Sequence, residues 1–421
     1  PDIENSKDWD TTKNVFIEGD NLEVLKILQK HYHGKIKMIY IDPPYNTGKD
    51  FVYPDNFKEG LGTYLEWTRQ VNEEGKKIST NSESEGRYHS NWLNMMYPRL
   101  RLARNLMTSD GVIFISIDDS EQSNLKALCD EVFGSDNFVA QIIRNTNSSK
   151  NQSLFVSVSH EYCLVYARSM AVLSEKHAEA KWSTPKNNVK EYKARVKKLQ
   201  KMGMPAEDIT QELKQLTNYP RFIDFTNYWY FDDRGLYRKD NLGGVKNGNM
   251  APLDNPLTGE PDAVPPGGYR FNAAKLNELV AQNRVHFHTD GSLPTIKRYL
   301  DENEGQRPKS IMSDDQRPDY SLLQAMGIPF DNPKQMAFMK RITSIIDPDA
   351  IVLDFFAGSG TTAHAVMELN AEDGGTRRFI QVQLPEPTPE GSEARASGFD
   401  TVSDICRARI CSAAARVAEA G

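Results

Sequence analysis

The stretch that most constrains this chain is a short apolar run that ends abruptly in two prolines. Residues 36–41 (Ile-Lys-Met-Ile-Tyr-Ile) are mostly apolar, and Asp42-Pro43-Pro44-Tyr45 follows at once. A run of this length, bounded by turn residues, predicts a buried strand. In open α/β sheets, ligands bind outside the carboxyl ends of the strands, so Asp42 is predicted to lie at a functional site.

The four residues after this strand have the right chemistry to hold a flat polar ring. Proline has no N–H and a fixed φ, so the carbonyls of this turn are expected to be held stiffly and to point outward as free acceptors. Asp42 adds a carboxylate, and Tyr45 adds an aromatic face with a polar tip. Such a cup suits a ring that carries an NH2 group. An ordinary turn remains the alternative, because Asp and Pro are common turn residues.

Composition limits the class of protein. The chain has 421 residues, of which 38% are hydrophobic and 26% charged, as is typical of a globular protein with a large core. No apolar run reaches the roughly 18 residues that span a membrane. The four cysteines have neither paired nor metal-ligand spacing, which favours a reducing cytoplasm. A net charge of −7 excludes an overall basic surface but allows a local basic groove.

Apolar patterns predict alternating strands and helices at the two ends of the chain. Strands are expected at 15–17, 36–41, 112–117, 162–167, 350–356 and 378–384. Helices are expected at 22–28, 91–107, 123–133, 336–346, 363–369 and 402–417. This alternation predicts a mostly parallel sheet. The polar residues 46–90 are expected to form a mobile loop over the site.

The middle of the chain has a different composition. Residues 171–217 are predicted to be helical and basic, and a solvated helix face is the plain alternative there. Residues 219–320 interleave aromatic and basic side chains with many Pro and Gly, which predicts a separate module with little regular sheet. A packing or oligomerisation insert is the alternative, because aromatic residues also build cores.

A second motif follows the expected strand at 350–356. Residues 357–362 (Ala-Gly-Ser-Gly-Thr-Thr) turn into a helix, and such a turn lets a ligand approach closely and offers it backbone N–H groups. A dinucleotide and S-adenosylmethionine both fit this shape, although Ala363 stands where a dinucleotide motif usually has its third glycine. The acceptor cup at Asp42 favours S-adenosylmethionine, because methyl transfer to an amine uses such acceptors and hydride transfer does not.

Together the two motifs resemble those of the amino-methyltransferases of DNA. Their order, with Asp42-Pro43-Pro44-Tyr45 first and residues 354–361 (Asp-Phe-Phe-Ala-Gly-Ser-Gly-Thr) last, is similar to the β class of that family. The chain further resembles the modification subunits of type III restriction-modification systems at residues 19–22, 47–48, 159–162, 331–334 and 382–386. The resemblance covers nearly the whole chain and is weakest at 171–217 and 72–90.

The resemblance implies a fold and a reaction. The fold is α/β: a Rossmann-like S-adenosylmethionine-dependent sheet assembled from segments 1–170 and 321–421, with a helical segment and target-recognition domain inserted at 171–320. The reaction is methyl transfer to the exocyclic amine of an adenine flipped out of double-stranded DNA, in the cytoplasm. Adenine is favoured because, in the family, Asp at the first position of the quartet goes mostly with adenine and Ser with cytosine.

Other functions and partners stay open at this point. The alternatives are an N4-cytosine or RNA amino-methyltransferase, a nicotinamide-dependent oxidoreductase and a non-catalytic DNA-binding subunit. A homodimer and a restriction (helicase-nuclease) subunit are open as partners.

The resemblance also assigns roles to residues. Asp42 and the Pro43 carbonyl would accept the amine hydrogens, with Pro44 in the same turn and Tyr45 stacked on the base. The predicted cofactor contacts are Asp20 and Asn21 (adenosine), Asn332 and Lys334 (methionine carboxylate), Glu386 (ribose), and Asp42, Asp354, Phe356, Gly358, Ser359, Gly360 and Thr361 (methionine end). The predicted DNA contacts are Lys193, Lys197, Arg234, Arg238 and Lys239. No metal is expected, because His286 and His288 have no third ligand nearby in the sequence.

Overall fold

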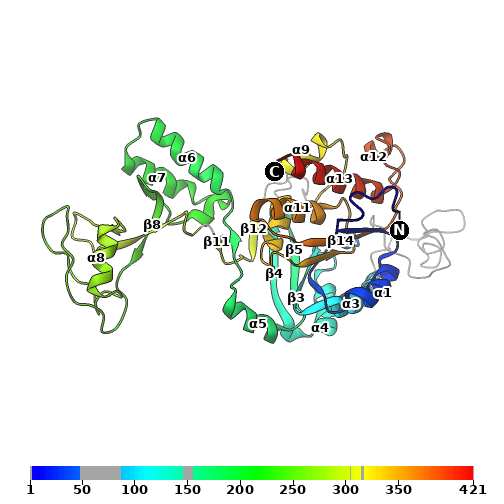
Figure 1. Cartoon of the computed structure of the whole chain (residues 1–421), viewed down its shortest axis with the longest axis horizontal. Coiled ribbons are helices and arrows are strands. Elements are labelled where there is room, and N and C mark those ends of the chain that lie inside the picture. Colours follow the sequence, from blue (N-terminus) through cyan, green and yellow to red (C-terminus); the bar gives the residue numbers. More distant parts are fainter. Residues whose placement is uncertain (1, 48–86, 146–154, 304, 314–316, 421) are drawn as a thin grey trace, which may run out of the picture. The chain divides into compact units, whose positions relative to one another are not determined.

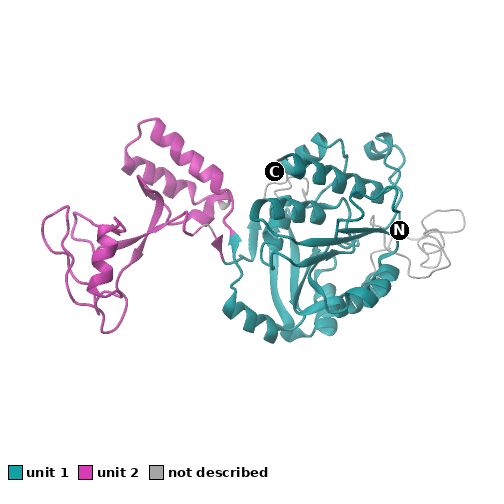
Figure 2. Cartoon of the chain, viewed as in Figure 1, with its two compact units in different colours: residues 1–184, 307–421 teal, residues 185–306 magenta. Residues whose placement is uncertain are grey.

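The computed structural model describes residues 2–47, 87–145, 155–303, 305–313 and 317–420. The chain divides into two compact units, the first made of residues 1–184 and 307–421 and the second of residues 185–306 (Figure 2). The first unit therefore combines both ends of the sequence, and the second is an excursion between them. The loop expected at 46–90 falls almost entirely outside the described residues.

The first unit is organised around one eight-stranded sheet of order β1-β14-β13-β2-β3-β5-β4-β12. The strands are β1 (Val15–Glu18), β2 (Ile36–Ile41), β3 (Met107–Ile117), β4 (Phe138–Asn145), β5 (His160–Ala167), β12 (Ile311–Ser313), β13 (Ile351–Asp354) and β14 (Arg378–Gln383). All neighbouring pairs are parallel except the two that involve β5. The expectation of a mostly parallel sheet is confirmed, but β5 runs antiparallel because it follows β4 in the chain and pairs with it directly.

Helices cover both faces of this sheet. One face packs against α1 (Asn21–Tyr32), α3 (Arg87–Leu106) and α4 (Gln122–Phe133). The other packs against α5 (Met170–Glu179), α10 (Met336–Thr343) and α11 (Thr361–Asp373). Successive strand residues point to opposite faces, so Ile39 and Ile41 of β2 join the first core, and Met38 and Tyr40 join the second. The helices α9 (Arg317–Ala325), α12 (Glu393–Ala396) and α13 (Val402–Ala420) complete the unit.

The two strands that carry the sequence motifs are direct neighbours. Met38 of β2 lies opposite Val352 of β13, and Ile39 lies opposite Leu353, in a parallel pair. Strands from the two ends of the chain thus lie in one sheet, and their carboxyl ends meet at one edge (Figure 1). The loop that begins at Asp42 and the glycine turn after Asp354 therefore start side by side.

The excursion is shorter than the segment 171–320 expected from the sequence. Leu173 of α5 and Met312 of β12 are buried in the core of the first unit, so residues flanking the excursion on both sides belong to that unit. The entry strand β6 (Thr184–Pro185) and the exit strand β11 (Gly305–Gln306) of the excursion pair with each other.

The second unit contains more sheet than its composition suggested. The strands β7 (Tyr230–Asp232), β8 (Gly235–Asn241), β10 (Thr295–Tyr299) and β9 (Val285–His286) form an antiparallel sheet in that order. One apolar cluster joins α6 (Val189–Lys201) and α7 (Ala206–Leu216) to Leu236, and another joins α8 (Ala273–Ala281) to Val285 and Ile296. The sequence-based expectation of little regular sheet is wrong, because Lys, Arg and Asp within β8 and β10 hide the alternation that marks a strand.

Candidate active site

A cavity of about 840 Å³ opens at the carboxyl ends of the central strands. Its walls come from the loop after β2, the glycine turn after β13, the end of β14 and the segment before α10. They include Asp42, Pro43, Pro44, Tyr45, Asp118, Arg144, Glu161, Asn332, Lys334, Asp354, Phe356, Gly358, Ser359, Thr361, Gln383 and Glu386. Both sequence motifs therefore face one space, at the edge where doubly wound sheets bind their ligands.

Two acceptors of the loop after β2 have different partners. The buried Oδ1 atom of Asp42 is 3.0 Å from the Lys334 ammonium in an ion pair, although no described residue donates a well-directed hydrogen bond to it. The Pro44 carbonyl, in contrast, accepts a hydrogen bond of 2.7 Å from the indole N–H of Trp92. The expectation that both proline carbonyls stay free is thus wrong for Pro44, whose carbonyl anchors the loop to α3.

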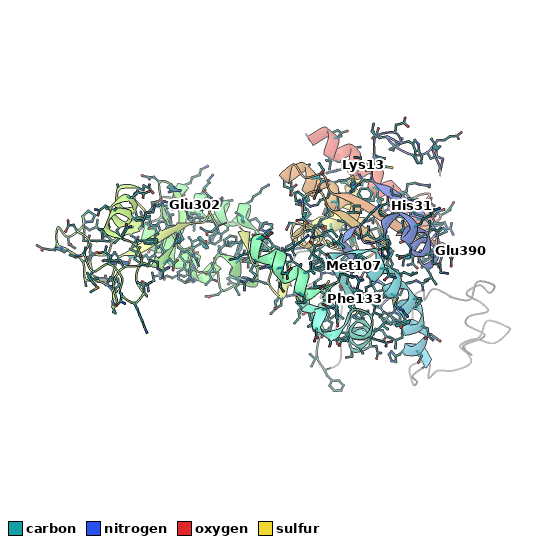
Figure 3. All side chains as sticks on the ribbon, turned by 60° about the horizontal axis from the view of Figure 1, so that its bottom comes forward. Lys13, His31, Met107, Phe133, Glu302 and Glu390 are labelled. Carbon is teal, nitrogen blue, oxygen red and sulfur yellow. The ribbon has the colours of Figure 1, made fainter. Side chains whose placement is uncertain are left out.

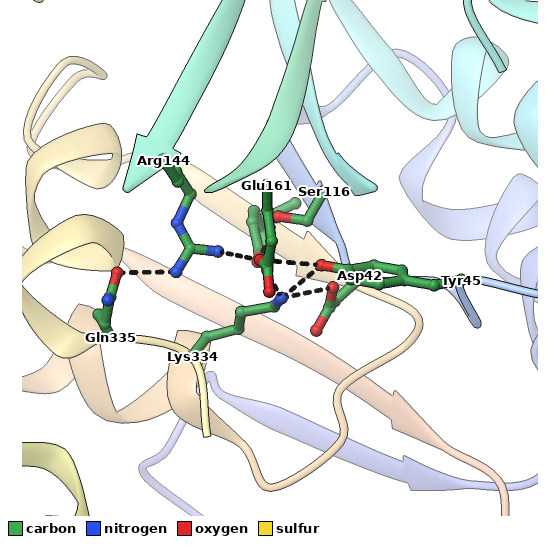
Figure 4. A network of polar contacts seen from close by, with 8 residues as sticks. Asp42, Tyr45, Ser116, Arg144, Glu161, Lys334 and Gln335 are labelled. Atoms are coloured by element: carbon green, nitrogen blue, oxygen red, sulfur yellow. Dashed lines mark hydrogen bonds and ion pairs between the residues drawn. The ribbon is translucent and has the colours of Figure 1, made fainter. Parts of the chain in front are cut away.

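Lys334 lies between the acidic groups of this wall. Its ammonium is 3.0 Å from Asp42 Oδ1 and donates hydrogen bonds to the Tyr45 hydroxyl (2.6 Å) and to Glu161 Oε2 (3.0 Å). The Tyr45 hydroxyl donates in turn to Glu161 Oε2, at 3.1 Å. Figure 4 shows these side chains converging from the β2 loop, from β5 and from the segment before α10. The structure thus joins Lys334, predicted to partner the cofactor carboxylate, to the quartet Asp42–Tyr45.

Glu161 is held as a carboxylate by two cations. Burial alone would raise its pKa, but the Lys334 ammonium and the Arg144 guanidinium together lower the pKa of Glu161 to about 2. Arg144 is 3.0 Å from Glu161 Oε2 and donates to Gln335 Oε1 at 2.7 Å, and its guanidinium lies 4.5 Å from the centre of the Phe338 ring. Glu161 is therefore charged at neutral pH and firmly anchored.

The glycine turn after β13 is built largely from its own residues. Asp354 accepts hydrogen bonds from the Phe356 N–H (3.1 Å) and from the Thr362 hydroxyl (2.6 Å), which ties the end of the strand to the start of α11. Burial raises the pKa of Asp354 to about 7, although these two hydrogen bonds act to lower it. Asp354 lines the cavity, but its oxygens are engaged in shaping the turn.

The two glycines of the turn have different surroundings. Gly358 has a φ of +53°, and a Cβ built on it would meet no atom within 4 Å, so its α-carbon faces open space in the cavity wall. Its N–H donates to Gln383 Oε1 at 2.7 Å, so this amide does not point at a ligand as expected. A Cβ on Gly360 would lie 3.1 Å from Cys406 Sγ. Gly360 therefore serves the packing of α13, and its contact with the cofactor stays a prediction.

Ser359 and Thr361 also have partners within the protein. Both hydroxyls accept hydrogen bonds from the buried guanidinium of Arg409, at 2.9 and 2.8 Å. Burial lowers the pKa of Arg409 to about 10. The two residues lie in the cavity wall, but their hydroxyls link the glycine turn to α13.

Two predicted cofactor residues lie elsewhere. Asp20 caps α1 by accepting hydrogen bonds from the N–H groups of Leu22 and Glu23. Asn21 is buried, donates to the Phe355 carbonyl at 2.7 Å and accepts from Arg99. Neither is among the described residues that line the cavity. The structure thus shows a structural role for both, and their contact with the adenosine stays a prediction.

The other predicted cofactor residues lie where the sequence placed them. Phe356, Asn332 and the half-buried Glu386 all line the cavity. Asn332 has a φ of +53° and accepts a hydrogen bond from Tyr320 at 3.3 Å.

The five predicted DNA contacts all lie in the second unit, in different settings. Lys193 pairs with Asp301, and Lys197 is exposed on α6. Arg234 pairs with Glu302, which also binds Arg284 and which Figure 3 labels in this unit. Arg238 and Lys239 are consecutive in β8 and so point to opposite faces of the sheet. Lys239 lies 4.0 Å from the centre of the Tyr230 ring, which makes it the predicted contact most closely joined to an aromatic face.

Several residues of the site escaped the sequence analysis. Glu161 stood within a stretch that carried the family resemblance, yet nothing in the sequence linked it to Asp42. Gln383 likewise stood within a stretch of the resemblance, but no role was assigned to it. Arg144, Trp92 and Arg409 carried no signal, since each acts on residues distant in the chain.

The described part of the chain contains neither a metal site nor a membrane-spanning helix. No group of three His, Cys, Asp or Glu side chains there is placed to hold a metal ion. No helix among those residues is long and apolar enough to cross a membrane.

The fold and the cavity define a class of protein. A doubly wound sheet whose central strands end at a cavity, with an acidic Pro-Pro-Tyr loop on one side and a glycine turn on the other, is the architecture of a cofactor-dependent α/β enzyme.

Comparison with known proteins identifies the family. The N6_N4_Mtase model, described as DNA methylase, matches residues 36–407. The chain is 34% identical to the EcoP15I Mod subunit of a type III restriction-modification enzyme from Escherichia coli, covering 97% of this chain and 64% of that protein. It is 36% identical to the EcoPI Mod subunit of Escherichia phage P1 (95% and 62% covered) and 30% identical to the type II methyltransferase M.KpnI of Klebsiella pneumoniae (97% and 89% covered). The chain belongs to this family of DNA methylases, and it spans less than two thirds of the length of these Mod subunits.

Proposed function

We propose that this protein transfers the methyl group of S-adenosylmethionine to the exocyclic amine of adenine in double-stranded DNA, at a specific sequence. The observation that carries the proposal is the pairing of β2 with β13, which brings the Asp42 loop and the Gly358 turn to one cavity. Methyl donor and methyl acceptor must meet in line, and two neighbouring strand ends allow that. The family match supports the same chemistry.

The cavity suits the cofactor in size and in lining. Its volume of about 840 Å³ lies in the upper part of the range of small-molecule sites, so a cofactor and a nucleobase can share it. The open space at Gly358 would take the methionine end beside the Phe356 ring, and Glu386 would accept hydrogen bonds from the ribose hydroxyls. When bound, S-adenosylmethionine supplies an electrophilic methyl group on a sulfonium, which needs no further activation.

The Asp42 loop would prepare the amine. The lone pair of an adenine amine is delocalised into the ring, so the nitrogen is a weak nucleophile. Asp42 Oδ1, which has only the Lys334 ammonium beside it, would take one amine hydrogen, and the Pro43 carbonyl would take the other, which draws the nitrogen toward tetrahedral geometry. A nitrogen–carbon bond forms, the carbon–sulfur bond breaks, and the nitrogen releases one proton in the direction of Asp42. Tyr45 would stack on the base once it has left the duplex.

The second unit would supply the sequence specificity. Lys239 above Tyr230, together with the exposed Lys197, offers the combination of cation and aromatic ring that reads bases and contacts phosphates. A restriction subunit and a second copy of the chain are proposed as partners, following the Mod subunits that this chain resembles. We place the protein in the cytoplasm, where bacterial DNA lies.

The test is methylation of DNA in cells that express the complete protein. Single-molecule sequencing should find N6-methyladenine at one short motif, and the methylated base should disappear with Asp42→Ala. N4-methylcytosine instead would support the cytosine alternative. A thermal shift adds an independent check, since S-adenosylhomocysteine should stabilise the protein and NADH should not. The proposal fails if neither base is modified, or if NADH alone stabilises the protein.

A further inference from the structure

The acceptor proposed for the target amine lies beside a resident cation. Lys334 Nζ is 3.0 Å from Asp42 Oδ1, yet its hydrogen bonds go to the Tyr45 hydroxyl and to Glu161 Oε2. Asp42 Oδ1 accepts no hydrogen bond from the described residues. The ammonium is therefore shared, because it lies 3.0 Å from Asp42 Oδ1 and 3.0 Å from Glu161 Oε2.

The Lys334 ammonium and the target amine would compete for the same oxygen of Asp42, and the amine would lose. An ammonium and an exocyclic amine are both nitrogen donors, and both would bind the same oxygen of Asp42. A hydrogen bond between charged partners is roughly twice as strong as one with a neutral donor. Unless another group engages the Lys334 ammonium, it would occupy the oxygen that the amine requires.

Glu161 is the group that engages it. One oxygen of its carboxylate, Oε2, accepts hydrogen bonds from Lys334, from the Tyr45 hydroxyl and from Arg144. Arg144 is buried and held in turn by Gln335, so the carboxylate cannot follow the lysine toward Asp42. The same contacts fix the Tyr45 ring, because its hydroxyl lies between Lys334 and Glu161 (Figure 4).

We propose that Glu161 is a positioning residue for methyl transfer: it shares the Lys334 ammonium with Asp42 and so weakens the hold of that ammonium on Asp42 Oδ1, the oxygen proposed to accept the target amine. This inference rests on the proposed function. It assigns no chemical step to Glu161, which acts only through Lys334 and Tyr45. Lys334, for its part, screens the two carboxylates from each other.

The proposal makes an unusual prediction for paired variants. Glu161→Gln keeps the shape of the side chain but removes its charge, so Lys334 should turn to Asp42, and kcat should fall about tenfold or more, which is about 1.4 kcal/mol in activation free energy. Lys334→Met in the same chain removes the competing cation. The double variant E161Q/K334M should therefore be faster than E161Q, by about threefold or more.

A matched control is available in the same unit. Glu121 is fully buried, whereas the Glu161 side chain is 25% exposed, and Glu121 accepts hydrogen bonds from Asn46, the residue after Tyr45, and from Asn124. E121Q should lower activity through the loop, but adding K334M should not restore any of it. If K334M restores activity to E161Q but not to E121Q, the effect comes from the release of Asp42 and not from a general change in the loop.

The experiment uses the complete protein, with kcat measured at saturating DNA and cofactor. Binding of S-adenosylhomocysteine by each variant shows that the fold and the cofactor site are intact, and E161D replaces E161Q if the latter does not fold. A double variant as slow as E161Q, or an E161Q with the wild-type rate, would overturn the proposal.

A second measurement keeps this test separate from that of the proposed function. Thermal unfolding of wild type, E161Q, K334M and the double variant forms a cycle that needs no DNA. Coupling between the two substitutions without any DNA methylation by wild type would refute the proposed function and leave the Glu161–Lys334 contact supported. Additive substitutions would refute the contact itself.

Discussion

The turn after β13 and the loop after β2 face the same cavity, but the chain holds them differently. In the turn, Asp354 bonds to residues two and eight positions away, Gly358 to a residue 25 positions away, and Ser359 and Thr361 to Arg409, 50 and 48 positions away. In the loop, Pro44 is held from 48 positions away, and Tyr45 from 116 and 289. The glycine turn is shaped by its own residues and by the segments that follow it, because its task is to leave room. An acceptor cup needs charges placed around it, and here they come from more remote segments.

The largest expected effect is on the β2 side. Asp42→Ala removes the acceptor of the amine, so kcat should fall by at least about a hundredfold, about 2.7 kcal/mol, while S-adenosylhomocysteine and DNA still bind. Methylation with labelled cofactor measures the rate, and calorimetry measures the binding. A variant that keeps a tenth of the wild-type rate would show that the cup is not where the amine is prepared.

The β13 side should respond in binding instead of rate. Gly358→Val places a branched side chain in the open cavity, so the affinity for S-adenosylmethionine should fall about tenfold or more, which is about 1.4 kcal/mol. Gly374→Val is the matched control, since Gly374 also has a positive φ (+71°) and no atom within 4 Å of an added Cβ, but ends α11. Both variants carry the same backbone strain, and equal cofactor affinities in both would contradict the placement of the cofactor at Gly358.

The hydrogen bond that anchors the loop after β2 to α3 can be removed at one atom, the indole nitrogen of Trp92. Trp92→Phe removes the indole N–H that binds the Pro44 carbonyl and leaves that carbonyl without its donor, at a cost of about 1–3 kcal/mol. We expect kcat to fall several-fold while the affinity for S-adenosylhomocysteine stays unchanged. The Trp229 indole donates to Thr217 in the second unit, so Trp229→Phe is the control for the loss of a buried indole bond. A loss of cofactor affinity specific to Trp92→Phe would mean that the two sides of the cavity are not built independently.

The smallest effect concerns stability and pH on the β13 side. The folded-state pKa of Asp354 is raised from 3.8 to about 7, so its contribution to stability is complete below about pH 4 and is lost as the pH rises through 7. Asp354→Asn removes this titration and can keep both hydrogen bonds if the Thr362 hydroxyl turns to accept. The melting temperature of the variant should exceed that of wild type by a few degrees at pH 8 and not at pH 4. A difference independent of pH would contradict the raised pKa.

Local pattern was sufficient for the elements and for the motif residues. The sequence by itself determined β2, β13 and the helices around them, because apolar periodicity and the stops at Pro and Gly act within a few residues. It also predicted the quartet at residues 42–45 and the glycine turn, since a resemblance of short motifs needs no knowledge of distant partners. It misjudged the sheet of the second unit, where charged side chains on both faces of β8 and β10 conceal the period of two.

Only the tertiary structure decided which of these residues act together. The pairing of β2 with β13 set Asp42 beside Gly358, and the insertion of β5 between β3 and β4 brought Glu161 to Lys334. The same packing makes Asp20 the N-cap of α1 and places Gly360 against Cys406 of α13. The physical reason is one of range: hydrogen bonds and ion pairs act over about 3 Å in space, whereas a sequence records only separation along the chain.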